Sequence, residues 1–201
     1  SAASDVYKRQ IYDIGLGGCL YSPSGINIPE LTEIIDAHGP KAFEVYATEH
    51  GAKFGDFSWR DEHLSANGKI DLFLPCAASQ TVTAQAAKKM VDMGLKYVSE
   101  GANNPTSPEA DQQFLAGGVT VIPDVLANAG GVAGSYMEMS KAASMSIPTE
   151  DETLEAVRGI LTKAWEQVNA ACESYGVDSL RLAGDALAVS KIAAAHQVRG
   201  W

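Results

Sequence analysis

Hydrophobic residues in the middle of the chain fall into short continuous runs that alternate with segments of helical periodicity. The run Ile-Asp-Leu-Phe-Leu-Pro at 70–75 stops at a proline, which is typical of a strand buried on both faces. Residues 81–94 place alanine and methionine side chains on one helical face and end at a glycine, and a second short strand follows at 95–102. The pattern therefore begins as strand, helix, strand.

Helix start signals recur through the second half of the chain. Ser107, followed by Pro108 and Glu109, has the composition of a helix N-terminus. Thr149 and Glu152 have capping-box spacing in front of a long amphipathic segment. The pattern predicts these further elements: a helix ending at 117–118, a strand over 119–127, a helix over 128–145, a helix from 149 onward and a last helix over about 179–197.

The first part of the chain has a weaker pattern. Residues 11–21 are rich in glycine, and Asn27 with Glu30 has capping-box spacing in front of a helix that closes at Gly39. Residues 40–68 mix aromatic, charged and small residues and predict a loop-rich excursion with one short helix.

Repeated strand–helix units predict parallel βαβ connections. We therefore expect an α/β fold with a Rossmann-like, doubly wound and mostly parallel sheet, followed by C-terminal helices. Ligands bind such sheets at the carboxyl ends of the strands. Three polar or glycine-rich segments follow predicted strands, at 75–77, 100–104 and 128–135, so we expect them to line one crevice.

Composition narrows the classes of partner. The 201 residues carry a formal net charge of −10, which argues against nucleic acid and anionic membranes, because both need a surface of opposite sign. The chain has no apolar run of membrane-spanning length and no basic-then-apolar secretion signal at its start. Cys19, Cys76 and Cys172 are too scattered to predict a disulfide framework, and the four histidines lack metal-ligand spacing. We expect a cytoplasmic protein without a metal site.

The segments that follow the predicted strands carry the candidate chemistry. Small residues at 100–103 let a flat ligand approach the backbone, and Asn103 offers both a donor and an acceptor. The alternative is an ordinary strand-to-helix turn, in which Asn and Gly are common. Cys76 also follows a strand, but no histidine is near it in the sequence, so a buried thiol is expected there rather than a nucleophile.

The glycine-rich segment at 128–135 opens a predicted helix. Free backbone N–H groups at a helix start favour anions such as carboxylate or phosphate. Val132 and Ser135 are three residues apart and share a helix face, so one could contact the carbon chain of a ligand while the other holds its carboxylate. The alternative is that the glycines serve only the close packing of the helix.

Three motifs together resemble a known family. The motifs are Leu-Pro-Cys-Ala-Ala-Ser-Gln, Ser-Glu-Gly-Ala-Asn-Asn-Pro-Thr-Ser-Pro-Glu-Ala and Ile-Pro-Asp-Val-Leu-Ala-Asn-Ala-Gly-Gly-Val-Ala-Gly-Ser-Tyr-Met-Glu-Met. In this order and spacing they resemble the cofactor domain of glutamate dehydrogenase, which belongs to the hexameric Glu/Leu/Phe/Val dehydrogenase family. The similarity covers about residues 18–200. Leucine and phenylalanine dehydrogenases lack the Pro-Thr continuation, so the match favours glutamate.

The resemblance implies oxidative deamination of L-glutamate to 2-oxoglutarate and ammonia with NAD or NADP, or the reverse reaction. It also implies that Asn103 and Asn128 contact the cofactor near its nicotinamide half and that Ala77 and Ala78 line the cofactor groove. The acidic residue that helps to choose between NAD and NADP should lie at 13–18. The sequence there is irregular, so the choice is left open.

For the substrate, the resemblance implies contacts from Val132 and Ser135, with the serine holding the side-chain carboxylate of glutamate. The catalytic lysine and aspartate of the family and its phosphate-binding turn precede the region covered here, so no catalytic residue is expected in this chain. We therefore expect the sheet to be incomplete at its N-terminal side, and the chain alone neither to turn over glutamate nor to bind a dinucleotide tightly.

The resemblance also suggests a domain organisation. Residues 11–147 would form part of a dinucleotide-binding domain, and 148–201 would be C-terminal helices packing toward the catalytic domain, within a homohexamer. Residues 1–10 match, in all ten positions, what one frame of a common sequencing adapter would encode, so we expect the natural sequence to start near Ile11 as part of a larger gene.

Two alternatives stay open. One is a stand-alone, non-catalytic cofactor-domain protein with a binding or regulatory role. The other is a related dehydrogenase for a different amino acid, although the hydroxyl of Ser135 argues against a purely apolar substrate side chain.

Overall fold

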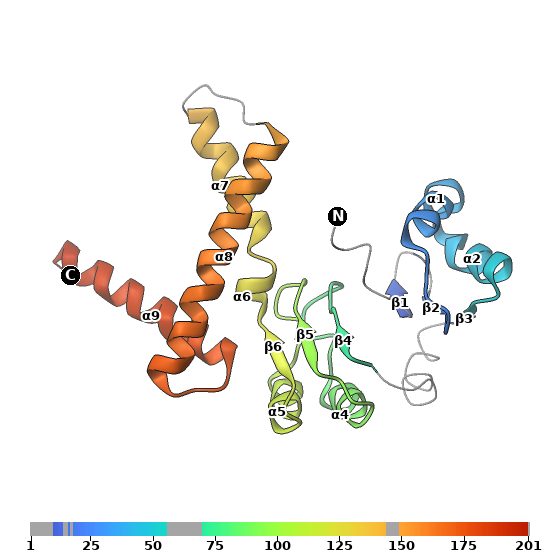
Figure 1. Cartoon of the computed structure of the whole chain (residues 1–201), viewed down its shortest axis with the longest axis horizontal. Helices are drawn as coiled ribbons and strands as arrows, with labels where there is room; N and C mark the ends of the chain where they lie inside the picture. The colour runs from blue at the N-terminus through green and yellow to red at the C-terminus, as the bar shows by residue number, and fades with distance from the viewer. Residues whose placement is uncertain (1–9, 14–15, 17, 56–69, 144–148, 201) are drawn as a thin grey trace. The chain divides into compact units, whose positions relative to one another are not determined.

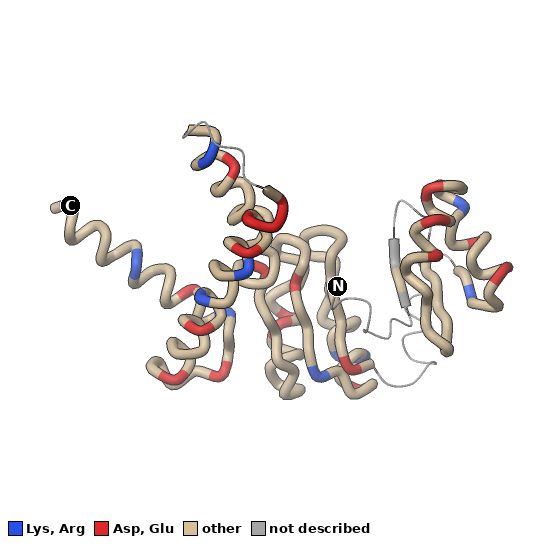
Figure 2. Tube along the Cα trace, turned by 45° about the horizontal axis from the view of Figure 1, so that its top comes forward, with Lys and Arg blue, Asp and Glu red and all other residues tan. Residues whose placement is uncertain are grey.

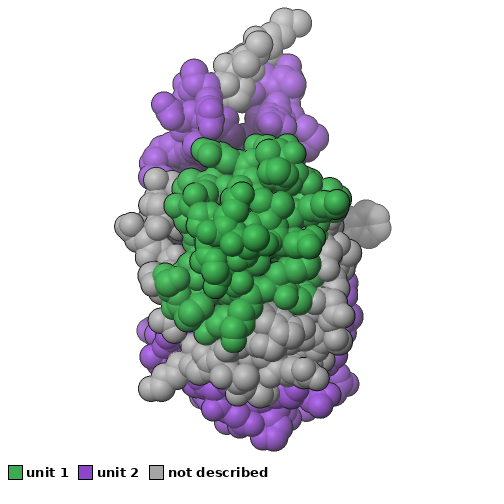
Figure 3. Space-filling view, turned by 90° about the vertical axis from the view of Figure 1, so that its right-hand side faces the viewer, with its two compact units in different colours: residues 1–69 green, residues 70–201 purple. Residues whose placement is uncertain are grey.

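The computed structural model describes residues 10–13, 16, 18–55, 70–143 and 149–200. The chain divides into two compact units, residues 1–69 and 70–201 (Figures 1 and 3). The expected adapter stretch lies outside the described residues up to position 9, while Gln10 opens the first strand. The boundary expected near residue 147 stays a prediction.

The first unit contains an antiparallel sheet. Its strands are β1 (Gln10–Asp13), β2 (Gly18–Tyr21) and β3 (Lys53–Gly55), in the order β1-β2-β3. A mostly parallel sheet was expected, and for this part of the chain that expectation is wrong. The reason is the short connection between β1 and β2, since parallel strands need a crossover of a dozen or more residues.

Helices pack on the antiparallel sheet and close the core of the first unit. They are α1 (Ile28–His38), the 3₁₀ turn η2 (Gly39–Lys41) and α2 (Ala42–His50). The Asn27 side chain caps α1 by accepting the Glu30 N–H, as the spacing predicted. The buried cluster consists of Leu20, Ile26, Leu31, Phe43 and Tyr46. The short helix expected after residue 40 is α2, and residues 56–69 of the excursion lie outside the described part.

The second unit contains the parallel sheet that the sequence predicted. Its strands are β4 (Leu72–Phe73), β5 (Tyr97–Ser99) and β6 (Thr120–Ile122), in the order β4-β5-β6. The crossovers are α4 (Ala84–Asp92) and α5 (Pro108–Ala116), which pack side by side. Thr83 and Ser107 cap these helices through their hydroxyl oxygens. The α/β class is confirmed.

Two expectations for the strands are wrong. The first strand was expected to be buried on both faces, but Leu72 and Leu74 are 40% and 46% exposed. The reason is that β4 is an edge strand of the described sheet. The third strand ends at Ile122 instead of continuing to 127, and a short helix α6 (Asp124–Ala127) follows. Pro123 stops the strand because it has no N–H to donate to a sheet.

Three helices complete the second unit: α7 (Gly130–Ala143), α8 (Glu150–Tyr175) and α9 (Leu180–Arg199). The capping box between Thr149 and Glu152 is present at the start of α8. The end of α8 and the start of α9 share a buried cluster of Val168, Ala171, Leu180 and Ala183, against which Ile122 of β6 packs. Both helices therefore lie in one compact unit with the sheet, and their expected packing toward a preceding domain stays a prediction.

Acidic side chains predominate on the described surface. Figure 2 shows Asp and Glu spread over the helices of both units, with a concentration in the first turn of α8 at Glu150, Asp151 and Glu152. None of the described helices combines the length with the apolar composition that a membrane crossing needs.

Candidate functional site

The loops that follow β4, β5 and β6 lie at one edge of the parallel sheet, because the carboxyl ends of parallel strands meet there. We call residues 75–83, 100–107 and 123–131 the rim. Backbone hydrogen bonds join its first two segments: Ala102 N–H donates to Pro75 C=O over 2.9 Å, and Gln80 N–H donates to Asn104 C=O over 2.8 Å. These bonds join two of the three segments that were expected to line one crevice.

The two asparagines that the sequence singled out are brought together. Asn128 Nδ2 donates to Asn103 Oδ1 over 2.7 Å, although they follow different strands. Asn103 is exposed and Asn128 is half-buried. Each carboxamide has one acceptor oxygen and a two-proton donor, so the pair keeps a donor on Asn103 and an acceptor on Asn128 for further hydrogen bonds.

The backbone of the rim is strained at two adjoining points. Gln80 and Asn104 have φ values of 56° and 46°, in the left-handed region that residues other than glycine rarely adopt. The hydrogen bond from Gln80 N–H to Asn104 C=O joins these two residues directly, and the Ser79 hydroxyl donates to the same carbonyl over 3.2 Å. Such strain clusters at functional sites, where surrounding contacts hold it in place.

The β4 side of the rim carries Ala77 and Ala78. Both are exposed, and the Thr81 hydroxyl donates to Ala78 C=O over 2.9 Å, which folds this segment into a turn. Cys76 was expected to be buried, but it is exposed. A Cβ at Gly101 would lie 2.5 Å from Cys76 Sγ, so the thiol side chain rests against the Gly101 backbone and needs a glycine there.

The α7 side of the rim carries Val132 and Ser135. Both side chains are exposed, Val132 to 71%, on a helix that starts two residues after Asn128. The packing explanation for the glycines holds only in part. Gly130 lies against side chains of α8, whereas a Cβ at Gly131 or Gly134 would meet nothing within 4 Å. Because these two glycines lack side chains, the helix surface beside Ser135 is accessible to a ligand.

A buried ion pair lies at the start of the second segment of the rim. The side chain of Glu100 is fully buried, and Arg181 of α9 donates to its Oε1 over 2.7 Å. Arg181 also approaches Asp111 Oδ1 at 3.4 Å and Asp124 Oδ1 at 3.6 Å. Burial disfavours the charged guanidinium, but the hydrogen bond and charge of Glu100, reinforced by Asp111, outweigh burial and raise the pKa of Arg181 above its ordinary value.

The carboxylates of Glu100 and Asp124 also accept hydrogen bonds from backbone N–H groups of the rim. Glu100 Oε2 accepts the Asp124 N–H over 2.9 Å, and Asp124 Oδ2 accepts the Asn104 N–H over 2.7 Å. Arg181 and Asp124 were not predicted from the sequence. One signal was available: a carboxylate that directly follows a buried strand needs a cation, because an unpaired buried charge is too costly. The sequence alone did not say which arginine it would be.

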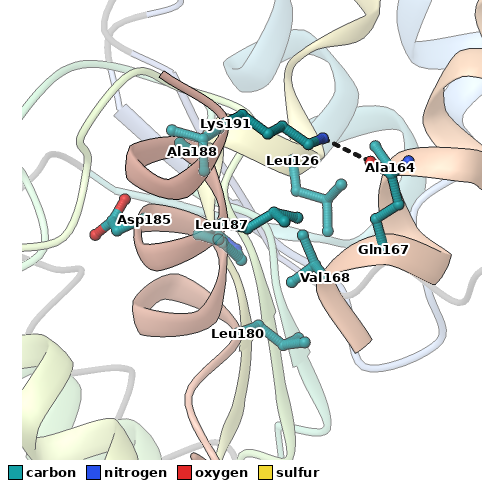
Figure 4. Close-up of a pocket in the computed structure, with 12 residues that line it drawn as sticks. Leu126, Ala164, Gln167, Val168, Leu180, Asp185, Leu187, Ala188 and Lys191 are labelled. Carbon is teal, nitrogen blue, oxygen red and sulfur yellow. Dashed lines mark hydrogen bonds between the residues drawn. The ribbon is translucent and has the colours of Figure 1, made fainter. Parts of the chain in front are cut away.

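A shallow hollow lies beside the third segment of the rim, which contributes Pro123, Val125 and Leu126 to its lining. It has a volume of about 220 Å³, and residues of α6, α8 and α9 line it, with the hydrogen bond from Lys191 to Gln167 at its edge (Figure 4). None of the six residues proposed from the sequence contributes to its lining. Within the described part of the chain, no three His, Cys, Asp or Glu side chains are grouped as metal ligands.

Comparison with known proteins decides the family. A family model described as Glutamate/Leucine/Phenylalanine/Valine dehydrogenase matches residues 14–200. The chain belongs to this family. The resemblance seen in the three motifs is thereby confirmed.

Named relatives within the family are glutamate dehydrogenases. The chain is 33% identical over 187 residues to the NADP-specific glutamate dehydrogenase A1 of Halobacterium salinarum, covering 91% of this chain and 41% of that protein. It is 31% identical over 184 residues to the catabolic NAD-specific glutamate dehydrogenase RocG of Bacillus subtilis, covering 92% and 40%. A solved glutamate dehydrogenase structure superposes with a TM-score of 0.80 at 28% identity, covering 97% of this chain and 43% of that one. The chain thus spans about two fifths of the length of its relatives.

Proposed function

We propose that this chain is the cofactor-binding part of a glutamate dehydrogenase. The whole enzyme would deaminate L-glutamate oxidatively to 2-oxoglutarate and ammonia with NAD or NADP, or run the reverse reaction. The observation that carries the proposal is the Asn103–Asn128 pair on the rim of a parallel sheet, in a chain whose relatives are glutamate dehydrogenases.

The residues of the rim fit the nicotinamide half of the cofactor. The pair keeps a donor on Asn103 and an acceptor on Asn128, which is the complement of a ligand carboxamide that offers an acceptor and a donor. Ala77 and Ala78 are exposed and small, so a flat ring system can approach the loop closely. When bound, the nicotinamide supplies the hydride acceptor for oxidation of the substrate.

The start of α7 fits the substrate. The exposed Ser135 hydroxyl and the N-terminal end of α7 suit a carboxylate, because a helix N-terminus favours negative charge. The exposed Val132 side chain lies on the same helix and offers an apolar contact to the carbon chain of glutamate. This division of roles would select an amino acid whose side chain ends in a carboxylate.

The proposal divides the chemistry between this chain and another part of the enzyme. The resemblance to the family assigns the proton transfers to a lysine and an aspartate that precede the region covered here. Neither NAD nor NADP is favoured, since relatives of both specificities match with similar identity. For the whole protein we propose a homohexamer in the cytoplasm, as the family resemblance implies.

The test is to sequence the DNA upstream of the Ile11 codon in the source sample. An open frame that encodes a catalytic domain with a glycine-rich lysine motif and a phosphate-binding turn supports the proposal. We call the protein encoded by that frame together with this chain the extended enzyme. A start codon immediately upstream of Ile11 would instead support the stand-alone binding protein and overturn the proposal.

A further inference from the structure

Arg181 connects the C-terminal helices with the rim. It lies in the first turn of α9, next to Leu180, which is buried in the cluster shared with Val168 of α8. Its guanidinium extends to Glu100, 81 residues earlier in the chain. A single side chain therefore joins the packed end of α8 and α9 to the end of β5.

Two paths of polar contacts run from Arg181 to the backbone of the rim, one through Glu100 and one through Asp124. In the first, Arg181 binds Glu100 Oε1 over 2.7 Å, and Glu100 Oε2 accepts the Asp124 N–H over 2.9 Å. In the second, Arg181 lies 3.6 Å from Asp124 Oδ1, and Asp124 Oδ2 accepts the Asn104 N–H over 2.7 Å. Both paths end on the backbone of the loops that carry the candidate cofactor residues.

Each path stops one step short of the asparagine pair. Asn104 directly follows Asn103, so the bond to its N–H fixes the peptide next to the Asn103 side chain. On the other side, the Asn128 N–H donates to Asp124 C=O over 3.0 Å and closes the single turn of α6. The distance between Asn103 and Asn128 therefore depends on where Asp124 is held.

The charges explain why this position needs a cation. Arg181 is three-quarters buried and faces the carboxylates of Glu100, Asp111 and Asp124. Without the guanidinium, these carboxylates would repel one another, and the fully buried Glu100 would lack its counter-charge. The strand ends of β5 and β6 would then be pushed apart at the point where the rim begins.

We propose that Arg181 is a positioning residue that holds Asn103 and Asn128 at hydrogen-bonding distance through Glu100 and Asp124. The consequence for cofactor binding rests on the proposed function, but the positioning itself does not. The competing view is that Arg181 only anchors the start of α9 to the sheet. The two views differ in what happens to the rim when the guanidinium is removed.

The test is amide hydrogen exchange by NMR on the isotopically labelled chain, without any ligand. In Arg181→Gln, we expect the amides of Asn104 and Asp124 to exchange at least about tenfold faster relative to the Ala87 amide in α4, because each loses a bond to a fixed carboxylate. We also expect the side-chain amide resonances of Asn128 to shift toward those of a free carboxamide.

Matched variants separate positioning from folding. Arg158→Gln removes an arginine whose Glu155 partner lies on the exposed face of α8, and it should leave the rim unchanged. Arg181→Lys keeps the charge and should restore most of the protection at Asn104 and Asp124. If Arg181→Gln does not fold, Asp124→Asn decides: the Asn104 amide should exchange faster, while the amide at position 124, which donates to Glu100, keeps its protection.

The outcomes are distinct. Faster exchange confined to the first turn of α9, with Asn104 and Asp124 unchanged, overturns the proposal in favour of a simple anchor. In the extended enzyme, Arg181→Gln should raise the KM for the dinucleotide about tenfold more than it changes kcat, and Arg181→Lys should restore most of this loss. An extended enzyme that does not oxidise glutamate would overturn the proposed function, whereas the exchange result would still decide the role of Arg181.

Discussion

Asn128 Nδ2 donates a hydrogen bond to Asn103 Oδ1 over 2.7 Å, and this bond joins the loops after β5 and α6. It is the contact on which the cofactor proposal depends, because it orders two carboxamides and leaves each with one group for a ligand. Since α7 begins two residues later, the same bond also places the proposed substrate helix next to the proposed cofactor loop.

Replacement of Asn128 tests the cofactor side of the rim. Asn128→Ala removes both the bond to Asn103 and the free acceptor, so the KM of the extended enzyme for the dinucleotide should rise by about tenfold or more. Asn169→Ala is the matched control, since Asn169 Nδ2 donates only within α8, to Trp165 C=O. Steady-state kinetics at saturating glutamate give both values. Equal KM values for the two variants would count against the assignment of Asn128.

Replacement of Ser135 tests the substrate side. Ser135→Ala removes one hydrogen bond to a charged carboxylate, so the KM for glutamate should rise by about 10- to 100-fold, while the KM for the dinucleotide stays within about twofold. Ser190→Ala is a suitable control, because the Ser190 hydroxyl donates to Leu187 C=O in α9. A Ser135→Ala enzyme with an unchanged KM for glutamate would show that the hydroxyl does not hold the substrate.

The contact between Gly101 and Cys76 predicts a coupled pair of substitutions. A Cβ at Gly101 would lie 2.5 Å from Cys76 Sγ, so Gly101→Ala should lower the free energy of unfolding by about 1–3 kcal/mol. The double variant Gly101→Ala with Cys76→Ala should recover most of this loss, whereas Cys76→Ser, which keeps an atom at that place, should not. Urea denaturation of the parent, Gly101→Ala, Cys76→Ala and the double variants gives the free energies of unfolding to compare. Additive effects in the alanine pair would mean that the two residues are not in contact.

The buried charge of Glu100 predicts a large effect on stability. Arg181→Gln leaves this carboxylate without a counter-charge and should cost about 3 kcal/mol or more in urea denaturation. Arg158→Gln, on the exposed face of α8, should change stability by less than about 0.5 kcal/mol. Similar losses for the two variants would contradict the importance of the buried pair.

The pKa of Arg181 predicts how this stability depends on pH. Because its folded-state pKa is raised above the ordinary value, the contribution of the charged guanidinium is fully present below that ordinary value and is lost only as the pH rises through the folded-state pKa. Arg181→Lys introduces a group with an ordinary pKa of about 10.4, so the stability difference from the parent should stay constant up to about pH 10 and grow only as the pH rises further. Denaturation midpoints at several pH values test this. A difference between the two proteins that also stays constant above about pH 10 would contradict it.

Much of the second unit could be predicted from the sequence, because its signals are local. Thr83, Ser107 and Thr149 each stand where a helix begins, and each accepts a hydrogen bond from the helix that it caps. The crevice at the strand ends was likewise predictable, since polar and glycine-rich residues follow runs of apolar ones. The meeting of Asn103 and Asn128 then follows from the parallel order of β5 and β6.

Other features depend on contacts that no local pattern contains. The antiparallel pairing of β1, β2 and β3 was missed, because a glycine-rich stretch gives no sign of its strand partner. The early end of β6 was missed although Pro123 marks it in the sequence, and only the bond from the next N–H to the Glu100 carboxylate involves a distant residue. The pairing of Arg181 with Glu100 spans 81 residues, so it too is a contact that no local sequence pattern indicates.

The most direct test of the central claim is the substrate preference of the extended enzyme, measured as kcat/KM for L-glutamate, L-leucine and L-phenylalanine with NAD and with NADP. We expect reduction of at least one dinucleotide with glutamate, and a preference for glutamate over the apolar amino acids of at least about 100-fold, since the proposed substrate site offers the Ser135 hydroxyl and a helix N-terminus to a side-chain carboxylate. Preference for leucine or phenylalanine, or no glutamate-dependent reduction of either dinucleotide, would contradict it.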